Sequence, residues 1–321
     1  MRTSTRLLIV AGLLLFSVSA VFASGQAEDD GRIVVGFSQI GAESAWRVAN
    51  TESIVSEAEN RPNIVLKFSD AQQKQENQIK AIRSFIAQDV DVIAFSPVVE
   101  TGFEAVLQEA KAAGIPVILT DRAVDVEDDD LWVTFMGSDF VEEGRKAGRW
   151  VVDNVGTELN VVELQGTVGS APAIDRKTGF EEIIADHPGI QITRSQSGDF
   201  TRAGGKEVME AFLKADGDNI DVLYAHNDDM ALGAIQAIKD YGLDPGTDIK
   251  IVSVDAVRGA FEAMIAGDLN VTVECSPLLG PQLFDAVEAL MNGEELPRRI
   301  VTEESVFEAS VAADVIDSRA Y

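Results

Sequence analysis

Cysteine and histidine are nearly absent from this chain. Its 321 residues include one cysteine, Cys275, and two histidines, His187 and His226. A single cysteine excludes an internal disulfide, so the hydrophobic core must supply the stability of the fold. Two histidines are too few for the usual zinc cluster, and the chain has no GxSxG, CxxC, HExxH or GxGxxG motif. We therefore expect no enzyme activity, no cofactor and no metal.

Basic residues are also scarce. Lys and Arg number 26 against 54 Asp and Glu, which gives a net charge of −28. Such a field repels nucleic acid and anionic membranes. A DNA-binding regulator would also need an N-terminal helix-turn-helix, and this N-terminus is apolar instead. We therefore expect no nucleic-acid partner.

The N-terminus has the pattern of a secretory signal peptide. Arg2 and Arg6 precede an apolar run over residues 7–22, and Val21 and Ala23 fit a small-residue cleavage pattern. The run is short for a membrane span, although an uncleaved anchor is the alternative. We predict that residues 1–23 form a signal peptide cleaved near Ala23, and that the mature protein is periplasmic.

Apolar strands alternate with amphipathic helices along the rest of the chain. In the first half, strands are predicted over residues 32–38, 63–70, 91–97 and 115–121, with helices over 47–59, 72–88 and 102–113. The second half repeats this order, with strands over 159–166, 190–196, 219–227 and 249–255 and helices over 175–186, 204–215 and 229–241. Alternation of this kind is typical of parallel sheets with right-handed crossovers.

The repeat predicts an α/β fold of two doubly wound, Rossmann-like lobes with parallel sheets, joined by a three-segment hinge. Crossings between the lobes are predicted within residues 131–139, 271–277 and 303–311. The first lobe would comprise residues 31–137 plus 276–304, and the second residues 138–275 plus 305–321. Several crossings make a hinge, so the lobes could close over a ligand. One continuous sheet is the alternative.

Polar residues stand where the predicted strands end. Asp121 and Arg122 follow one buried strand, and Asp255 ends the matching strand of the second half. Ligands bind at the carboxyl ends of strands in such sheets. A carboxylate beside a guanidinium suits a small molecule rich in hydroxyls, although a turn-capping Asp beside a surface Arg would have the same sequence.

A second group of candidates lies in loops and at helix starts. Trp46 could offer a ring face to a sugar, or could pack between the lobes. Arg176 is predicted in the first turn of its helix, at the place that Arg47 holds in the first half. A surface Arg there would oppose the helix dipole, which favours a ligand role. Asn227 is a predicted helix N-cap that could also contact ligand. The acidic run at 127–130 lacks the spacing of a calcium loop.

Several segments resemble one known family. These are VGFSQIGAESAWR, DAQQKQENQIKAIRSFIAQ, VVELQGTVGSAPAIDRKTGF, RSQSGDFTRAGGKEVMEAF and YAHNDDMALGAIQAIKD. They resemble the periplasmic sugar-binding proteins of ABC importers, of the ribose/galactose type, over residues 32–321. The resemblance is greatest to members that bind galactofuranose, through the ESAWR loop and Arg176.

The resemblance implies a receptor that closes on one monosaccharide, with galactofuranose as the expected ligand, and delivers it to a membrane permease with its ATPase subunit. The protein would be a monomer. A receptor for another pentose or hexose, or for chemotaxis, remains open, as does a secreted glycoside hydrolase using Asp121 and Asp255. The implied ligand contacts are Glu43, Ser44, Ala45, Trp46, Arg47, Asp121, Arg122, Arg176, Asn227, Asp255 and, at the hinge, Glu274.

Overall fold

Two six-stranded sheets organise the computed structural model, which describes residues 31–321. The predicted signal peptide lies outside the described residues. The first sheet has the order β11-β5-β4-β3-β1-β2, and all of its strands are parallel. Its strands are β1 (Ile33–Gln39), β2 (Ile64–Asp70), β3 (Val92–Phe95), β4 (Val117–Thr120), β5 (Thr134–Gly137) and β11 (Arg299–Val301).

The second sheet has the matching order β12-β10-β9-β8-β6-β7. Its strands are β6 (Leu159–Gln165), β7 (Ile190–Ser197), β8 (Val222–Ala225), β9 (Lys250–Asp255), β10 (Val271–Glu274) and β12 (Val306–Glu308). Only the β10–β12 pair is antiparallel among the described strands of this sheet. The prediction of two doubly wound lobes is confirmed, and the alternative of one continuous sheet is wrong.

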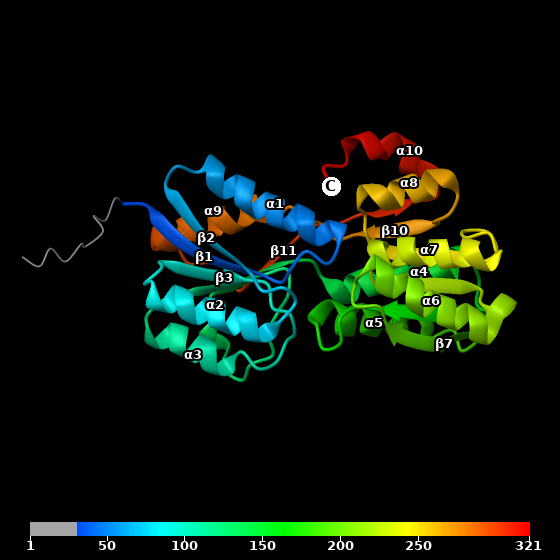
Figure 1. Ribbon diagram of the computed structural model, residues 1–321, viewed down its shortest axis with the longest axis horizontal. Coiled ribbons are helices and arrows are strands. Elements are labelled where there is room, and N and C mark those ends of the chain that lie inside the picture. Colours follow the sequence, from blue (N-terminus) through cyan, green and yellow to red (C-terminus); the bar gives the residue numbers. More distant parts are fainter. Residues whose placement is uncertain (1–30) are drawn as a thin grey trace, which may run out of the picture. The chain divides into compact units, whose positions relative to one another are not determined.

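Helices cover both faces of each sheet (Figure 1). In the first lobe, α1 (Ala45–Asn60) packs with α9 (Gly280–Met291) on one face, and α2 (Gln75–Ala87) packs with α3 (Glu104–Ala112) on the other. In the second lobe, α4 (Phe140–Asn154) pairs with α5 (Ala171–Ile184), α6 (Arg202–Asp216) with α7 (Asp228–Tyr241), and α8 (Arg258–Ala266) with the short α10 (Ala312–Val315). Sheets covered on both faces explain why β3, β4 and β8 are wholly buried.

The chain crosses between the lobes three times. It leaves β5 of the first sheet for α4, leaves β10 of the second sheet for α9, and passes from β11 to β12. The crossings are therefore residues 138–139, 275–279 and 302–305. The lobe boundaries set out from the sequence remain a prediction, but each predicted crossing region overlaps one of these passages.

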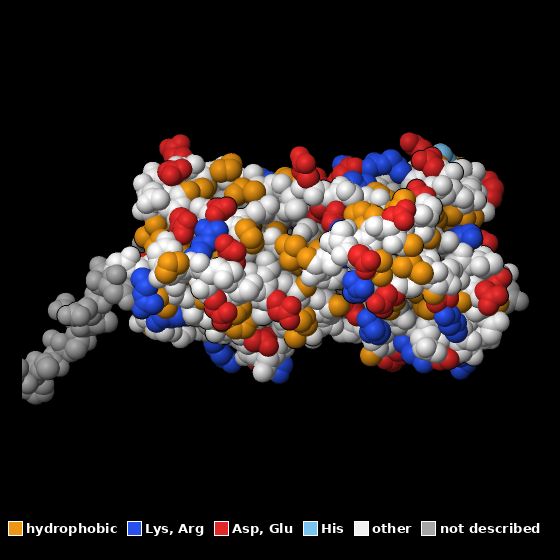
Figure 2. Space-filling model, turned by 90° about the horizontal axis from the view of Figure 1, so that it is seen from above, with side chains coloured by type: hydrophobic (Ala, Val, Ile, Leu, Met, Phe, Trp, Pro, Cys, Tyr) orange, Lys and Arg blue, Asp and Glu red, His pale blue; other side chains and the backbone are white. Residues whose placement is uncertain are grey.

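Charged side chains are mixed over the surface. On the face drawn in Figure 2, Asp and Glu side chains lie among Lys and Arg over both lobes. No helix among the described residues combines the length and the apolar character needed to cross a membrane.

Candidate functional site

A small cavity lies where strand ends of the two lobes face each other. Its lining combines charged side chains with aromatic rings, which suits one small polar ligand. Nine of the eleven predicted contacts line it, together with two residues that the sequence reasoning missed. The lining residues are Glu43, Ser44, Trp46, Arg47, Asp121, Arg122, Arg176, Phe200, Asn227, Asp255 and Cys275.

Arg47 anchors the polar wall of the first lobe. Its Nη2 lies 2.7 Å from Asp121 Oδ2, and its Nε lies 3.0 Å from Glu43 Oε1. Ser96 Oγ also donates to Asp121 Oδ2 at 2.9 Å. The buried charges of Arg47 and Asp121 therefore neutralise each other. Arg47 is placed in the first turn of α1 because the Ser44 side chain caps this helix and accepts from the Arg47 amide at 3.1 Å.

Arg122 is buried in the same wall with far fewer partners. Its Nη1 donates to the Val98 carbonyl at 3.1 Å, its Nε lies 3.7 Å from Asp121 Oδ2, and that Nε has no hydrogen-bond partner. Burial, and then the charge of Arg47, lower the pKa of Arg122 to about 10. Glu43 Oε2 is likewise buried without a partner. Two residues that line the cavity therefore have an unsatisfied polar atom each, one a donor and one an acceptor.

Arg176 anchors the wall of the second lobe. Its Nε lies 2.7 Å from Glu143 Oε2, its Nη1 donates to the His226 carbonyl, and its Nη2 lies 3.7 Å from Asp255 Oδ1. Burial opposes its charge, but Glu143 and the other acids around it raise the pKa of Arg176. Arg176 is thus held in one position as a permanent cation. The ring of His226 is buried beside this wall, and its Nε2 lies 3.0 Å from Glu163 Oε1.

The structure corrects the predicted helix position of Arg176. The sequence placed it in the first turn of a helix over residues 175–186, but α5 begins at Ala171, so Arg176 is its sixth residue and lies in the second turn. Pro172 in the first turn marks the true start. Arg47, in contrast, is the third residue of α1. The two arginines are therefore not at equivalent helix positions, and it is burial that singles out Arg176.

Two aromatic rings line the cavity from opposite lobes. Trp46, on α1, packs into the hydrophobic cluster of the second lobe, and its Nε1 donates to the Cys275 carbonyl at 2.7 Å. The Arg47 guanidinium lies 4.5 Å from the centre of its ring. Phe200 comes from the loop after β7, and Arg122 lies 5.2 Å from its ring centre. A Phe after Gly-Asp at a strand end was a signal that the sequence reasoning passed over.

Contacts between the lobes run along the edge of the cavity. Asp229, in the first turn of α7, accepts from the backbone amide of Ala45 at the start of α1, at 2.7 Å. Asn227 caps α7 as predicted, because its side chain accepts from the Met230 amide at 3.0 Å. An acid of one lobe thus caps a helix of the other.

The structure does not bring two of the predicted contacts into the cavity lining. Ala45 turns its amide to Asp229, as described, and Glu274 lies at the hinge. The Glu274 carboxylate lies 2.8 Å from Arg319 Nη1 and accepts from the Ser305 amide at 3.1 Å. The backbone of Cys275, its neighbour, meets the cavity side instead.

Both strand-end aspartates have an unusual backbone conformation. Asp121 has φ of 61° and Asp255 has φ of 123°. Positive φ is uncommon for residues other than glycine, and such strain concentrates at functional sites. Gly137 permits the first of these turns, since a Cβ there would lie 3.0 Å from Asp121 Cα.

Comparisons with known proteins agree with this geometry. A profile of the periplasmic binding protein domain matches residues 35–295. The galactofuranose-binding protein YtfQ of Escherichia coli (strain K12) is 50% identical over 96% of this chain and 97% of its own length. A Mycobacterium smegmatis protein solved in complex with beta-D-fucofuranose is 56% identical, with a TM-score of 0.87 over 90% of this chain and 95% of that one. The binding protein of the arabinose ABC transporter from Shewanella sp. ANA-3, bound to L-arabinofuranose, is 54% identical, with a TM-score of 0.87 over 89% of this chain and 95% of that one.

Proposed function

Because this chain belongs to the periplasmic binding protein family, we propose that it is the sugar receptor of an ABC importer and that it binds one furanose monosaccharide, foremost galactofuranose, between its lobes. The family implies a periplasmic location, which the predicted signal peptide, cleaved near Ala23, would provide. The receptor would act as a monomer without turning over its ligand. It would deliver the sugar to a membrane permease with its ATPase subunit.

The observation that carries this proposal is the set of unsatisfied polar atoms in the cavity. Arg122 Nε and Glu43 Oε2 are buried without partners. A buried polar group without a hydrogen bond costs about 1–3 kcal/mol. A ligand that both donates and accepts, as a sugar hydroxyl does, would satisfy both kinds of atom. Asp121 and Asp255 would accept further hydroxyl protons, and Arg47 and Arg176 would donate.

The apolar part of the lining supports a sugar rather than an inorganic ion. Trp46 and Phe200 add two aromatic rings to a wall of charged side chains. Aromatic rings pack against the C–H groups of a sugar while the charged groups take its hydroxyls. An anion such as phosphate would meet the buried acids Glu43, Asp121 and Asp255 in the same cavity, which disfavours it.

The ring form is suggested by the relatives. The three proteins compared above are described with galactofuranose, fucofuranose and arabinofuranose, which share a five-membered ring. They differ in the groups attached to that ring. We therefore propose that the cavity recognises the furanose ring, and that the substituents of the ring set the preference among these sugars.

Closure would follow from contacts that need both lobes. The Ala45–Asp229 and Trp46–Cys275 hydrogen bonds join the lobes around the cavity. A ligand that touches both walls stabilises the arrangement in which these bonds form. The closed receptor would be the form presented to the permease.

Calorimetry on the ligand-stripped mature protein tests the proposal. Galactose, L-arabinose, fucose, ribose, fructose and glucose would be titrated separately, and D-galactose labelled with ¹³C at the anomeric carbon would then be bound and examined by NMR. We expect one-to-one binding and an anomeric signal at the furanose position. A pyranose signal would overturn the ring assignment, and no binding to any of these sugars would overturn the receptor assignment.

A turnover assay separates the receptor from a glycoside hydrolase. Aryl glycosides and furanosides would be incubated with purified protein, with the Asp121→Asn variant as control. We expect no product. Hydrolysis lost in that variant would favour the enzyme.

A further inference from the structure

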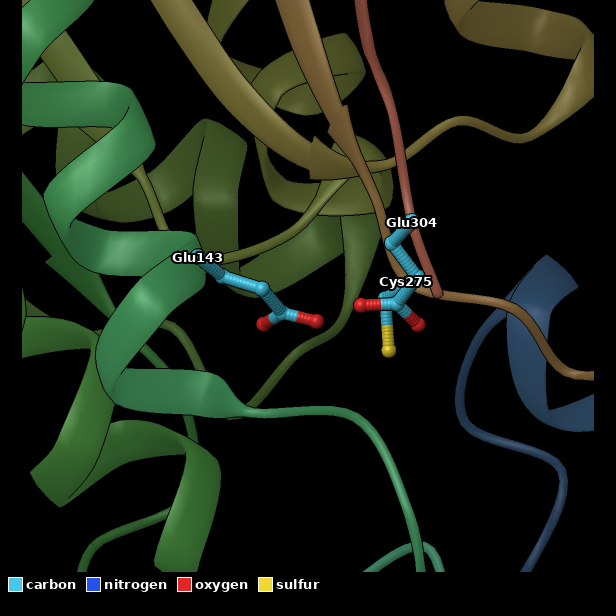
Figure 3. A group of neighbouring side chains, drawn as sticks. All are labelled: Glu143, Cys275 and Glu304. Carbon is cyan, nitrogen blue, oxygen red and sulfur yellow. The ribbon is translucent and has the colours of Figure 1, made fainter. Parts of the chain in front are cut away.

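Three side chains that are common metal ligands meet at the hinge (Figure 3). Glu143 comes from α4, Cys275 follows β10, and Glu304 lies between β11 and β12. One donor atom from each lies within 4.8 Å of the others. Ser138 joins them, because its Oγ lies 3.2 Å from Cys275 Sγ and donates to Glu304 Oε1. Two of the three crossings between the lobes therefore supply Cys275 and Glu304 to this hinge cluster, and Glu143 comes from the helix that follows the third.

The carboxyl groups of the hinge cluster have few partners. Glu143 is 1% exposed, and although its Oε2 is paired with Arg176, its Oε1 has no hydrogen-bond partner outside the cluster. Figure 3 shows this carboxylate pointing toward Cys275 and Glu304. Glu304 accepts from the Ser138 hydroxyl and the Ser276 amide, the latter at 2.8 Å, and its carboxyl also interacts with that of Glu143. Among the described residues, Arg176 is therefore the one cation paired with a carboxylate of the cluster.

The cations around the hinge cluster are occupied elsewhere. Lys146 Nζ donates to the Glu304 backbone carbonyl at 2.8 Å, and Arg299 Nη2 donates to the Ser138 carbonyl at 2.7 Å. Burial, and then the Glu143 carboxylate, raise the pKa of Glu304 to about 9, and burial raises the pKa of the Cys275 thiol well above its usual range. In the absence of another cation, protons occupy this cluster.

We propose that the hinge cluster of Glu143, Cys275 and Glu304 binds one zinc ion. One sulfur and two carboxylate oxygens are a donor set that zinc accepts, whereas magnesium and calcium select oxygen alone. Zinc bonds of about 2.0–2.3 Å hold donors roughly 3.3–3.8 Å apart, so side chains whose donor atoms lie within 4.8 Å of one another need to approach by at most about 1.5 Å. The bound ion ties α4 to two of the crossings and so stiffens the hinge.

Zinc titration of the chelator-stripped, untagged mature protein tests the site. We expect one zinc per chain by calorimetry. Zinc affinity should be at least about 100-fold weaker in Cys275→Ser and in Glu304→Gln, because losing a group that only hydrogen-bonds a metal ligand already costs about 10–100-fold. Glu142→Gln is the matched control, because Glu142 is the neighbour of Glu143 on α4 but forms ion pairs with Arg145 and Arg149 outside the cluster. It should bind zinc as the parent protein does.

Cobalt provides a readout that depends on direct ligation. Co²⁺ bound through Cys275 gives a sulfur-to-metal charge-transfer band in the near ultraviolet, which zinc then abolishes by displacement. We expect this band in the parent protein and in Glu142→Gln and its absence in Cys275→Ser. The test remains informative even if a variant fails to fold, since the band in the parent protein alone shows whether sulfur binds the metal.

Absence of stoichiometric zinc binding, equal zinc affinity in Glu304→Gln and the parent, or a cobalt complex without the sulfur band would each overturn the proposal.

Discussion

Each lobe places a buried arginine beside the aspartate that ends a central strand, yet the two arginines are held in different ways. Arg176 of the second lobe has Glu143 at 2.7 Å and Asp255 at 3.7 Å. Arg122 of the first lobe has Asp121 only at 3.7 Å, because that carboxylate is already bound by Arg47 at 2.7 Å. The guanidinium of Arg176 is therefore compensated by the protein, and that of Arg122 is not.

This difference separates two uses of a buried charge. A compensated arginine stabilises the fold and holds its fork in a fixed direction, and removing it leaves carboxylates stranded. An uncompensated arginine destabilises the empty protein, but its free donors become available to a ligand. We infer that the first lobe supplies the unsatisfied donor that the proposed sugar would occupy, and the second lobe supplies a preformed wall.

The largest expected effect is on stability when Arg176 is removed. Arg176→Met leaves Glu143 and Asp255 buried without their cation, so the free energy of unfolding should fall by about 3–5 kcal/mol. Urea denaturation followed by circular dichroism measures it. Arg122→Met is the matched control, since it removes an equally buried arginine. Equal losses in the two variants would contradict the comparison.

Arg122→Met should show the opposite balance. Burying a charge that is not paired costs free energy, and an apolar side chain in its place avoids that cost, so the unliganded variant should unfold at an equal or higher urea concentration. Its affinity for the sugar should nevertheless fall by about 2–5 kcal/mol through the loss of charge-assisted hydrogen bonds. Calorimetry on the same samples gives the affinity. Retained binding would remove Arg122 from the proposed contacts.

The aromatic walls can be compared in the same way, with a smaller effect. Phe200→Ala removes apolar contact area from the second-lobe wall and should weaken sugar binding by about 1–3 kcal/mol. Phe68→Ala, which truncates a 40% exposed ring on β2, should leave the dissociation constant unchanged. Gly166→Ala provides an indirect test, because a Cβ there would lie 1.8 Å from Phe200 Cζ and force the ring to move. Unchanged binding in both Phe200→Ala and Gly166→Ala would exclude a role for this ring.

Parallel strands with buried ends were the part of this molecule most open to prediction from sequence. Residues such as Asp121 and Asp255 are recognisable because each stands where an apolar run ends abruptly. Ligands bind at the carboxyl ends of strands in such sheets, so both residues are predicted at one site. The Gly-Asp that precedes Phe200 at its strand end is a weaker signal, and Cys275 has none, because its place depends on how the hinge strand packs in three dimensions. Glu143 was missed for a related reason: α4 was not assigned, and a glutamate on a helix reads as surface unless its buried face is known.

The start of α5 shows the same limit. Its first turn contains Ala171 and Pro172, and the predicted helix began four residues later at the first acid. The N-cap signal at Asn227 was local, since Asn227 caps its own helix. The Asp229 contact with Ala45 was not local, because the donor and acceptor belong to different lobes. Contacts between lobes depend on their relative placement, which no short stretch of sequence specifies.

The smallest effect concerns this contact between the lobes. Asp229→Ala removes the acceptor for the Ala45 amide. Asp229 reaches that amide only while the lobes are together, so the free energy of sugar binding should weaken by about 0.5–2 kcal/mol, as for loss of a helix cap. Asp229 also pairs with Arg202, whose side chain is 59% exposed. Arg202→Ala is therefore the control, and loss of that exposed pair alone should cost no more than about 1 kcal/mol.

Small-angle X-ray scattering at saturating sugar should show both variants as compact as the parent protein, since the sugar still touches both walls. Calorimetry on the same samples then reports the lower sugar affinity of Asp229→Ala. If Arg202→Ala loses as much affinity as Asp229→Ala, the ion pair rather than the cap carries the contact. If neither loses any, the walls of the cavity hold the lobes together unaided, and the difference between Arg122 and Arg176 becomes the main determinant of closure.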